Sequence, residues 1–95
     1  MTILDTAALN SALVGLQGWE PTKGGKALAK RFLFTDFNEA FGWMTRVAMA
    51  AEAANHHPDW RQSYKVVNVS LTTHSEGGLT ENDLKLARLM DEYAV

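Results

Sequence analysis

The stretch DFNEAFGWMTRVAMAAEAA, residues 36–54, decides the fold because it carries the strongest helix signal in the chain. Asp36, with Glu39 three positions later, forms a capping box, which predicts the start of a helix. Asn55 suits the end of that helix, and Pro58 forbids its continuation. The sequence therefore predicts one long helix at the centre of the chain.

The apolar side chains of this helix recur at spacings of four, three, four and three residues, as on one face of an α-helix. They are Phe37, Phe41, Met44, Ala48 and Ala51. We therefore expect these side chains to form the apolar face of the helix.

Two strands are predicted before the helix. In residues 26–34, successive side chains fall into two sets that would lie on opposite faces of a strand. Residues 19–23 form a shorter strand. Pro21 confines the shorter strand to an edge or an end, because proline has no N–H to donate to a neighbouring strand. Gly24-Gly25 between the two strands is typical of a two-residue hairpin turn.

Strand chemistry returns after the helix. Residues 59–73 contain the alternation Val-Asn-Val-Ser-Leu of a half-buried strand, and residues 60–63 can form a separate short strand before it. Gly77-Gly78 turns the chain, and Thr80 caps a final helix with Asp83 at its third position. The sequence thus predicts one or two strands and then a helix.

A first short helix is expected near the amino terminus, capped by Asp5 and ending near Gly18. Leu4 and Leu9, on either side of that cap, form a hydrophobic staple. The order is then helix, two strands, helix, one or two strands, helix. Helices packed on one face of an antiparallel sheet satisfy this order, so the predicted class is α+β.

Composition narrows the class of protein. The chain of 95 residues, 46% hydrophobic and 21% charged, fits one globular domain over residues 1–95. Because cysteine is absent, disulfides, thiolate zinc sites and a cysteine nucleophile are excluded. A net charge of −2 argues against binding to nucleic acid, which needs a basic excess. No apolar run could span a membrane and no signal peptide is recognisable, so we expect a cytoplasmic protein.

All three histidines fall in two places that follow regular structure: His56-His57 after the long helix, and His74 at the end of a strand. Polar side chains at such junctions can converge on a site. Glu52 lies four residues before His56, within reach if the helix persists that far. An imidazole exchanges protons near neutral pH and a carboxylate can fix its tautomer, so proton transfer is the chemistry on offer.

Structural interpretations of the same residues stay open. A histidine is more often a surface or half-buried residue than a catalytic one. Asp83 fits the ordinary role of a carboxylate in the first turn of a helix. Trp60, Tyr64 and Phe41 could stack on a flat heterocycle, but aromatic side chains in a small domain are more often part of the core.

Other chemistries have less support. Two adjacent histidines, His56 and His57, point in divergent directions, and neither a His-Glu-x-x-His helix nor a cysteine accompanies them, so no metal site is expected. Ser75 adjoins His74, yet neighbours in sequence seldom form the hydrogen bond that serine catalysis needs. Gly77-Gly78 lacks the lysine of a phosphate-binding loop.

The histidines and the residues around them form a spaced pattern that can be compared with known protein families. The pattern consists of Glu52-x-x-x-His56-His57-Pro58-x-Trp60, then Tyr64, Val67, Val69, Leu71 and Thr73-His74, then Gly78-Leu79-Thr80-x-x-Asp83-x-x-Leu86-Ala87. It resembles the pterin-4a-carbinolamine dehydratase family, and the upstream segment from Asp36 to Met44 fits the same family. The resemblance covers about residues 32–89.

The resemblance implies an α+β domain with a four-stranded antiparallel sheet and three helices on one face, in the order α-β-β-α-β-β-α. It implies a lyase, a 4a-hydroxytetrahydrobiopterin dehydratase, that converts 4a-hydroxytetrahydropterin to quinonoid dihydropterin and water. This reaction recycles the pterin of aromatic amino-acid hydroxylases such as phenylalanine hydroxylase. No metal or organic cofactor is implied, because the pterin is the substrate.

The same resemblance implies roles for individual residues. His56 and His74 form the catalytic acid–base pair, with the order of donor and acceptor left open, and His57 mainly holds the substrate. Glu52 orients or polarises His56, and Asp83 supports the far side of the pocket. Substrate contacts are implied for Pro58, Trp60, Thr73, Ser75 and Glu76.

Family members form dimers by sheet pairing and tetramers by helix packing, so a homodimer or homotetramer is implied, together with a functional link to phenylalanine hydroxylase. Neither nucleic acid nor a membrane is an expected partner. The alternative function is a non-catalytic dimerisation or interaction module of the same fold. Three titratable side chains in one cleft favour the enzyme, because a scaffold has no need of them.

Overall fold

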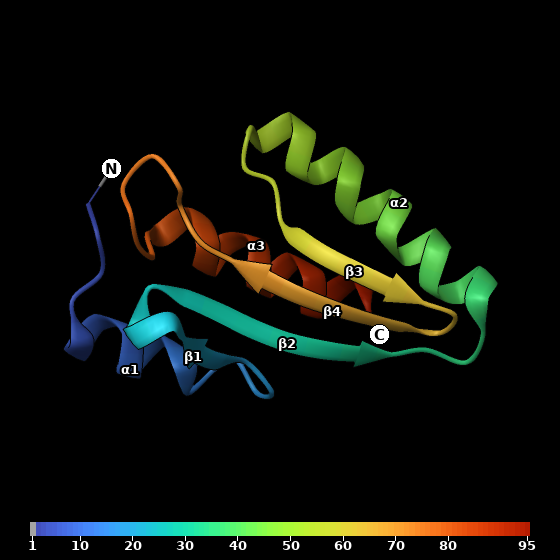
Figure 1. Cartoon of the computed structure of the whole chain (residues 1–95), viewed down its shortest axis with the longest axis horizontal. Helices are drawn as coiled ribbons and strands as arrows, with labels where there is room; N and C mark the ends of the chain where they lie inside the picture. Colours follow the sequence, from blue (N-terminus) through green and yellow to red (C-terminus); the bar gives the residue numbers. More distant parts are fainter. Residues whose placement is uncertain (1) are drawn as a thin grey trace.

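Three helices and four strands alternate along the chain, in a computed structural model that describes residues 2–95 (Figure 1). They are α1 (Thr6–Leu13), β1 (Glu20–Thr22), β2 (Ala27–Leu33), α2 (Phe37–Ala54), β3 (Asp59–Ser63), β4 (Val66–Leu71) and α3 (Glu81–Tyr93). This order and the antiparallel sheet confirm the predicted α+β class. None of the helices within residues 2–95 has the length and apolar content needed to cross a membrane.

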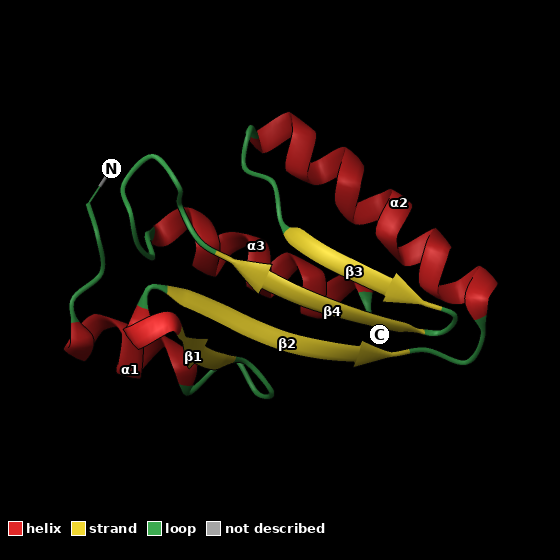
Figure 2. Ribbon diagram, in the orientation of Figure 1, coloured by secondary structure: helices red, strands yellow, loops and turns green. Residues whose placement is uncertain are grey.

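The strands form one antiparallel sheet in the order β1-β2-β4-β3, so β4 lies between β2 and β3. The short edge strand β1 contains Pro21, as the sequence predicts. In Figure 2, α1 and α3 lie behind the sheet, α2 runs along the β3 side, and the near face carries no helix. Side chains alternate accordingly, with Val67 and Val69 buried and Asn68 exposed.

Trp43 of α2 is fully buried at the centre of the core. Its ring centroid lies 4.5 Å from that of Phe32, 5.0 Å from that of Phe34 and 6.1 Å from that of Trp60. Its Nε1 donates a hydrogen bond to the carbonyl oxygen of Met90 at 3.1 Å. The indole therefore joins α2 both to the sheet and to α3, with its single polar atom satisfied.

The predicted apolar face of α2 coincides with the buried face only at Ala51, and for Phe37 and Phe41 it is wrong. The side chains that α2 buries are Ala40, Trp43, Val47 and Ala51. Phe37 and Phe41 are 50% and 55% exposed and stack on each other with centroids 5.9 Å apart. Both sets have helical spacing because apolar residues occupy most of the circumference of α2. The set with Trp43 is the buried one, since its ring fills the space against the sheet.

The predicted caps of the two later helices are confirmed. Asp36 Oδ1 accepts a hydrogen bond from the N–H of Glu39 at 2.8 Å, while the Glu39 carboxylate accepts from the N–H of Thr35 at 2.9 Å, so the cap forms with half of the predicted capping box. Asn55 ends α2 in the left-handed conformation, with a φ of 52°. Thr80 and Asp83 form a capping box at the start of α3. The caps at Asn55 and Thr80 fix one end of each of the two loops that carry the histidines.

The first helix starts as predicted and ends earlier. Asp5 Oδ1 accepts a hydrogen bond from the N–H of Ala8 at 2.7 Å. However, α1 ends at Leu13 rather than near Gly18, because the chain tightens into a turn in which the N–H of Leu16 donates to the carbonyl of Leu13 at 3.1 Å.

The turn between β1 and β2 is wider than the predicted two-residue hairpin. Strand pairing stops at Thr22 and Ala27, and a turn of 3₁₀-helix, Lys23–Gly25, lies between them. Lys23 and both glycines have positive φ, so the left-handed stretch extends over three residues and needs the longer connection.

Candidate active site

Two loops leave the same end of the sheet and carry all three histidines. Asp59, the first residue of β3, pairs with Ser70 near the end of β4. The loop before β3 (residues 55–58) and the loop after β4 (residues 72–80) therefore start side by side, and Figure 1 shows both at one end of the molecule. The β3–β4 pairing thus brings the two predicted histidine positions together.

Asp83 is fully buried and contacts the innermost histidine. Its Oδ1 lies 2.6 Å from His56 Nε2, and its Oδ2 accepts hydrogen bonds from the Thr73 hydroxyl at 2.7 Å and from the N–H of Thr80 at 2.9 Å. Because a carboxylate only accepts hydrogen bonds, the His56 proton that faces it sits on Nε2. Three donors thereby compensate the buried negative charge.

The way α2 ends explains why His56 turns inward. With Asn55 in the left-handed conformation, its N–H donates to the carbonyl of Glu52 at 3.1 Å, and the N–H of His56 donates to the carbonyl of Ala51 at 3.0 Å. This is the Schellman pattern of a helix terminus. The His56 side chain is left only 11% exposed, against Asp83 at the start of α3.

Glu52 does not contact His56, and the predicted pairing of these two residues is wrong. Glu52 Oε1 lies 2.7 Å from His57 Nε2, and the two side chains are 80% and 55% exposed. A contact between residues 52 and 56 needs the helix to continue through His56, whereas Asn55 ends it one residue earlier. The carboxylate beside His56 is that of Asp83.

His74 is the most exposed of the three histidines, at 75%, and its Nε2 lies 3.4 Å from Asp59 Oδ2. Asp59 was not among the residues that the sequence singled out. The available signal was a carboxylate directly after Pro58, at the start of a predicted strand. Its proximity to His74 depends on the register of β3 against β4, which local patterns do not specify.

The loop that follows β4 is held by the backbone of Thr73. Its N–H donates to the carbonyl of Gly78 at 2.9 Å, and its carbonyl accepts from the N–H groups of Glu76 and Gly77 at 3.0 Å. Ser75 and Glu76 are exposed within this loop. The loop is thus a compact, internally bonded turn that presents polar side chains to solvent.

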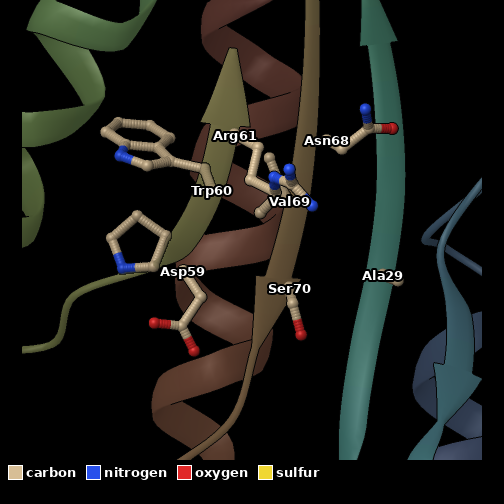
Figure 3. Close-up of a pocket in the computed structure, with 8 residues that line it drawn as sticks. Ala29, Asp59, Trp60, Arg61, Asn68, Val69 and Ser70 are labelled. Carbon is tan, nitrogen blue, oxygen red and sulfur yellow. The ribbon is translucent and has the colours of Figure 1, made fainter.

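Pro58 and Asp59 line one end of a hollow of about 560 Å³ on the face of the sheet that no helix covers (Figure 3). Trp60 borders the same hollow, but its ring points toward α2 in Figure 3, where it packs on Trp43. Trp60 is therefore shared between the core and the rim of the hollow.

The structure does not bring the other aromatic candidates to this place. Tyr64 follows β3 and precedes β4, so it lies at the far end of these strands from the histidines. Phe41 belongs to the exposed side of α2. In the part of the chain that the structure describes, no three histidine or acidic side chains gather in a way that could hold a metal ion.

A family model described as pterin 4 alpha carbinolamine dehydratase matches residues 2–93. The chain belongs to this family. This match confirms the resemblance to the pterin-4a-carbinolamine dehydratases that the sequence pattern indicated.

Two curated relatives come from Chelativorans sp. and Afipia carboxidovorans. They are 54% and 52% identical over 91 and 92 residues, covering 96% and 97% of this chain and 93% and 92% of their own length. Both carry the provisional name pterin-4-alpha-carbinolamine dehydratase. The likeness therefore extends over nearly the whole domain.

The crystal structure of a transcriptional coactivator/pterin dehydratase from Brucella melitensis matches with a TM-score of 0.95 at 44% identity, covering 99% of this chain and all of that one. A pterin dehydratase-like protein, described as a RuBisCO assembly factor in the alpha-carboxysome, matches with a TM-score of 0.71 at 22% identity, over 82% of this chain and 90% of that one. The second likeness shows a shared fold alone.

In this member of the pterin-4a-carbinolamine dehydratase family, every histidine has Nε2 facing a carboxylate. The pairs are His56 with Asp83, His57 with Glu52, and His74 with Asp59. An imidazole with an acceptor at one nitrogen keeps the other nitrogen for proton exchange. The arrangement can therefore give and take protons around a ligand held at this end of the sheet.

Proposed function

We propose that this protein dehydrates a 4a-hydroxytetrahydropterin to the quinonoid dihydropterin at the histidine end of the sheet. The observation that carries the proposal is the set of three histidines on two adjoining loops, each facing a carboxylate. Family membership supports a pterin as the substrate class. The product would return to the pterin pool of aromatic amino-acid hydroxylases such as phenylalanine hydroxylase.

The reaction breaks the bond between C4a and its hydroxyl oxygen and removes the proton from N5, so that a C4a=N5 double bond forms. One group gives a proton to the departing hydroxyl, which leaves as water, and another group takes the N5 proton. Each such transfer typically accelerates a reaction about 10²–10⁴-fold. The proposal uses no metal and no organic cofactor, because the pterin itself is the substrate.

His56 and His74 are the proposed acid–base pair, and their surroundings differ. Asp83 keeps the His56 proton on Nε2, so Nδ1 is the nitrogen that would exchange a proton with the substrate. Because His56 is nearly buried, its ring is held in place before the pterin binds. His74 lies on an exposed loop, where it can exchange its proton with water after each turnover.

His57 is proposed to hold the pterin, and its contact with Glu52 orients the imidazole ring for this role. Pro58, Ser75 and Glu76 would add contacts from the two loops. The hydroxyl, N–H and carbonyl of Thr73 are all bonded within the protein, so Thr73 would act on the pterin by shaping the loop. Trp60, Glu52 and Asp83 support the site from its rim and from the interior.

A binding experiment tests the proposal. The protein labelled with ¹⁵N at its histidines and tryptophans would be titrated with 7,8-dihydrobiopterin, which lacks the 4a-hydroxyl and cannot dehydrate. We expect the signals of His56, His57 and His74 to shift at saturation. The indole N–H of Trp19, which donates to Asp91 on α3 at 3.1 Å, serves as a remote control and should not move. Unchanged histidine signals at saturating ligand would overturn the proposal.

The exposed face of α2 favours self-association and keeps the alternative function open. Phe37 and Phe41 stack in the open, and Met49 is 70% exposed. Large apolar side chains exposed together mark protein contact sites. We propose that this face packs on the same face of a second copy, the helix packing by which the family resemblance implies a homotetramer. A non-catalytic interaction module would use the same face without needing the histidines.

A further inference from the structure

The face of the sheet that carries no helix has an ordered pattern of charge. Cross-strand pairing places Arg31 of β2, Asn68 of β4 and Arg61 of β3 in one row. The neighbouring row, nearer the histidines, consists of Glu20, Ala29, Ser70 and Asp59. Because residues two apart in a strand share a face, both rows point away from the helices.

Small side chains in the second row leave room for a ligand. The hollow of about 560 Å³ runs from Pro58 and Asp59, over Ser70, to Arg61 and Asn68. Figure 3 shows Asp59 and Ser70 at one end and Arg61 and Asn68 further along the strands. Its volume falls in the range of small-molecule sites, about 300–1,000 Å³.

A second hollow of about 360 Å³ continues the first one across β2. It shares Ala29 and Asn68 with the first hollow and extends past Arg31 to Glu20. The two arginines therefore border one continuous groove, with Asn68 between them.

Neither arginine has a partner in the protein. Within residues 2–95, Arg31 and Arg61 form no ion pair and donate no side-chain hydrogen bond, whereas Arg88 pairs with Glu81 at 3.2 Å. A guanidinium group binds a carboxylate or a phosphate through two parallel hydrogen bonds. Two strand spacings separate the arginines by about 10 Å at the backbone, so their side chains can converge on one anionic group above Asn68.

We propose that this groove receives the substituent on C6 of the pterin, and that Arg31 and Arg61 select a substituent with an anionic group, a carboxylate or a phosphate. This assignment rests on the proposed function. C6 is bonded to N5, one of the reacting atoms, so the substituent leaves the ring beside the histidines. Asp59 joins the two regions, because it faces His74 and also lines the groove. The arginine row lies about 7 Å further along the strands, within reach of a short substituent.

The surrounding charges favour one anionic group over a polyanion. Glu20 and Asp59 flank the groove on the two outer strands, and the whole chain has a net charge of −2. A nucleic acid lying across the sheet would meet these carboxylates at both edges, where a binding surface needs basic residues. A single carboxylate or phosphate between the arginines avoids both acids.

Three ligands that cannot dehydrate provide the test: 7,8-dihydrobiopterin, which is neutral, 7,8-dihydrofolate, which carries carboxylates, and a 7,8-dihydroneopterin phosphate. Calorimetric titration at low salt should give at least about ten-fold tighter binding for an anionic ligand than for the neutral one. Added salt should reduce this preference. The double variant Arg31→Gln/Arg61→Gln, which keeps the side-chain stems, should lose it. Arg88→Gln is the matched control and should keep it.

The outcomes separate this proposal from the proposed function. A preference for only the carboxylate or only the phosphate would support the anion site and identify the group. Equal affinity for the three ligands, or a preference that survives in the double variant, would overturn the anion site while dihydrobiopterin binding still supported the pterin site. Failure of all three ligands to bind would overturn both.

Discussion

Asp83 accepts hydrogen bonds from His56, Thr73 and Thr80 in a place that no solvent reaches. Removing its carboxylate would leave three donors without an acceptor, and a buried donor without a partner costs about 1–3 kcal/mol. The same carboxylate caps α3, so one residue links the stability of a helix to the position of the inner histidine.

Asp83→Ala should therefore lower the free energy of unfolding by about 3–5 kcal/mol, measured by urea denaturation. Glu81→Ala is the matched control, because Glu81 lies in the same helical turn with its side chain 47% exposed. The control should change the free energy by less than about 0.5 kcal/mol. A loss in Asp83→Ala no larger than in the control would contradict the network described above.

A second prediction follows from the pairing of His56 with Asp83 and of His57 with Glu52. Asp83→Asn should reduce kcat/KM in the parent and have little further effect once His56→Asn is present, because both changes remove one unit. The reduction in kcat/KM caused by Glu52→Gln should multiply with the reduction caused by His56→Asn, because Glu52 contacts His57 and not His56. Dehydration kinetics of the single and double variants measure both cycles. If His56→Asn masked the effect of Glu52→Gln, the pairing expected from sequence would be the functional one.

Residue positions were predictable from sequence to a greater extent than residue partners. The three histidines stood out because each follows regular structure. The choice between Glu52 and Asp83 as the partner of His56 depended on how Asn55 ends the helix, a question of backbone conformation at a single residue. Asp59 was missed because a cross-strand register brings it to His74.

Among the elements, α2 shows most clearly which structural features local sequence determines and which it does not. Both of its ends were predicted, because Asp36 and Asn55 act through hydrogen bonds to residues next to them. Its buried face was not, because apolar residues with helical spacing occupy more than one side of the helix. Contacts with β2 and β3, the strands before and after α2 in the chain, decide that Trp43 lies inward, and the pattern of α2 alone does not contain them.

Replacing one residue from each stripe tests this description of α2. Trp43→Ala should cost about 3–5 kcal/mol of unfolding free energy, because it empties the centre of the core. Phe41→Ala should cost less than about 1 kcal/mol, because that ring is 55% exposed. Urea denaturation would be followed at a dilution where light scattering gives the mass of one chain. Equal losses, or a larger loss in Phe41→Ala, would contradict this description of α2.

At the scale of the whole molecule, residues 2–95 leave two surfaces uncovered, the outer side of α2 and the outer face of the sheet. Phe37→Gln/Phe41→Gln should reduce the mass measured by size-exclusion chromatography with light scattering, because it places amides in an apolar contact. Val14→Gln is the control, since Val14 is 82% exposed at the end of α1. An unchanged mass in the double variant, with the parent above one chain, would rule out the α2 face as the contact.

At this scale the fold class and the order of elements were predictable, because they follow from local periodicity and from the family resemblance. The strand order β1-β2-β4-β3 was not, since it arises from pairing between segments far apart in the chain. The row of Arg31, Asn68 and Arg61 was invisible for the same reason. Only the register of three strands places these residues side by side.

The most direct test of the central claim is a stopped-flow dehydration assay. Freshly generated 4a-hydroxytetrahydropterin would be followed by absorbance with and without the protein. We predict acceleration over the spontaneous rate, and a loss in kcat of about 10²-fold or more in His56→Ala and in His74→Ala. A rate equal to the spontaneous one, or variants within a few-fold of the parent, would contradict catalysis by the histidines at this end of the sheet.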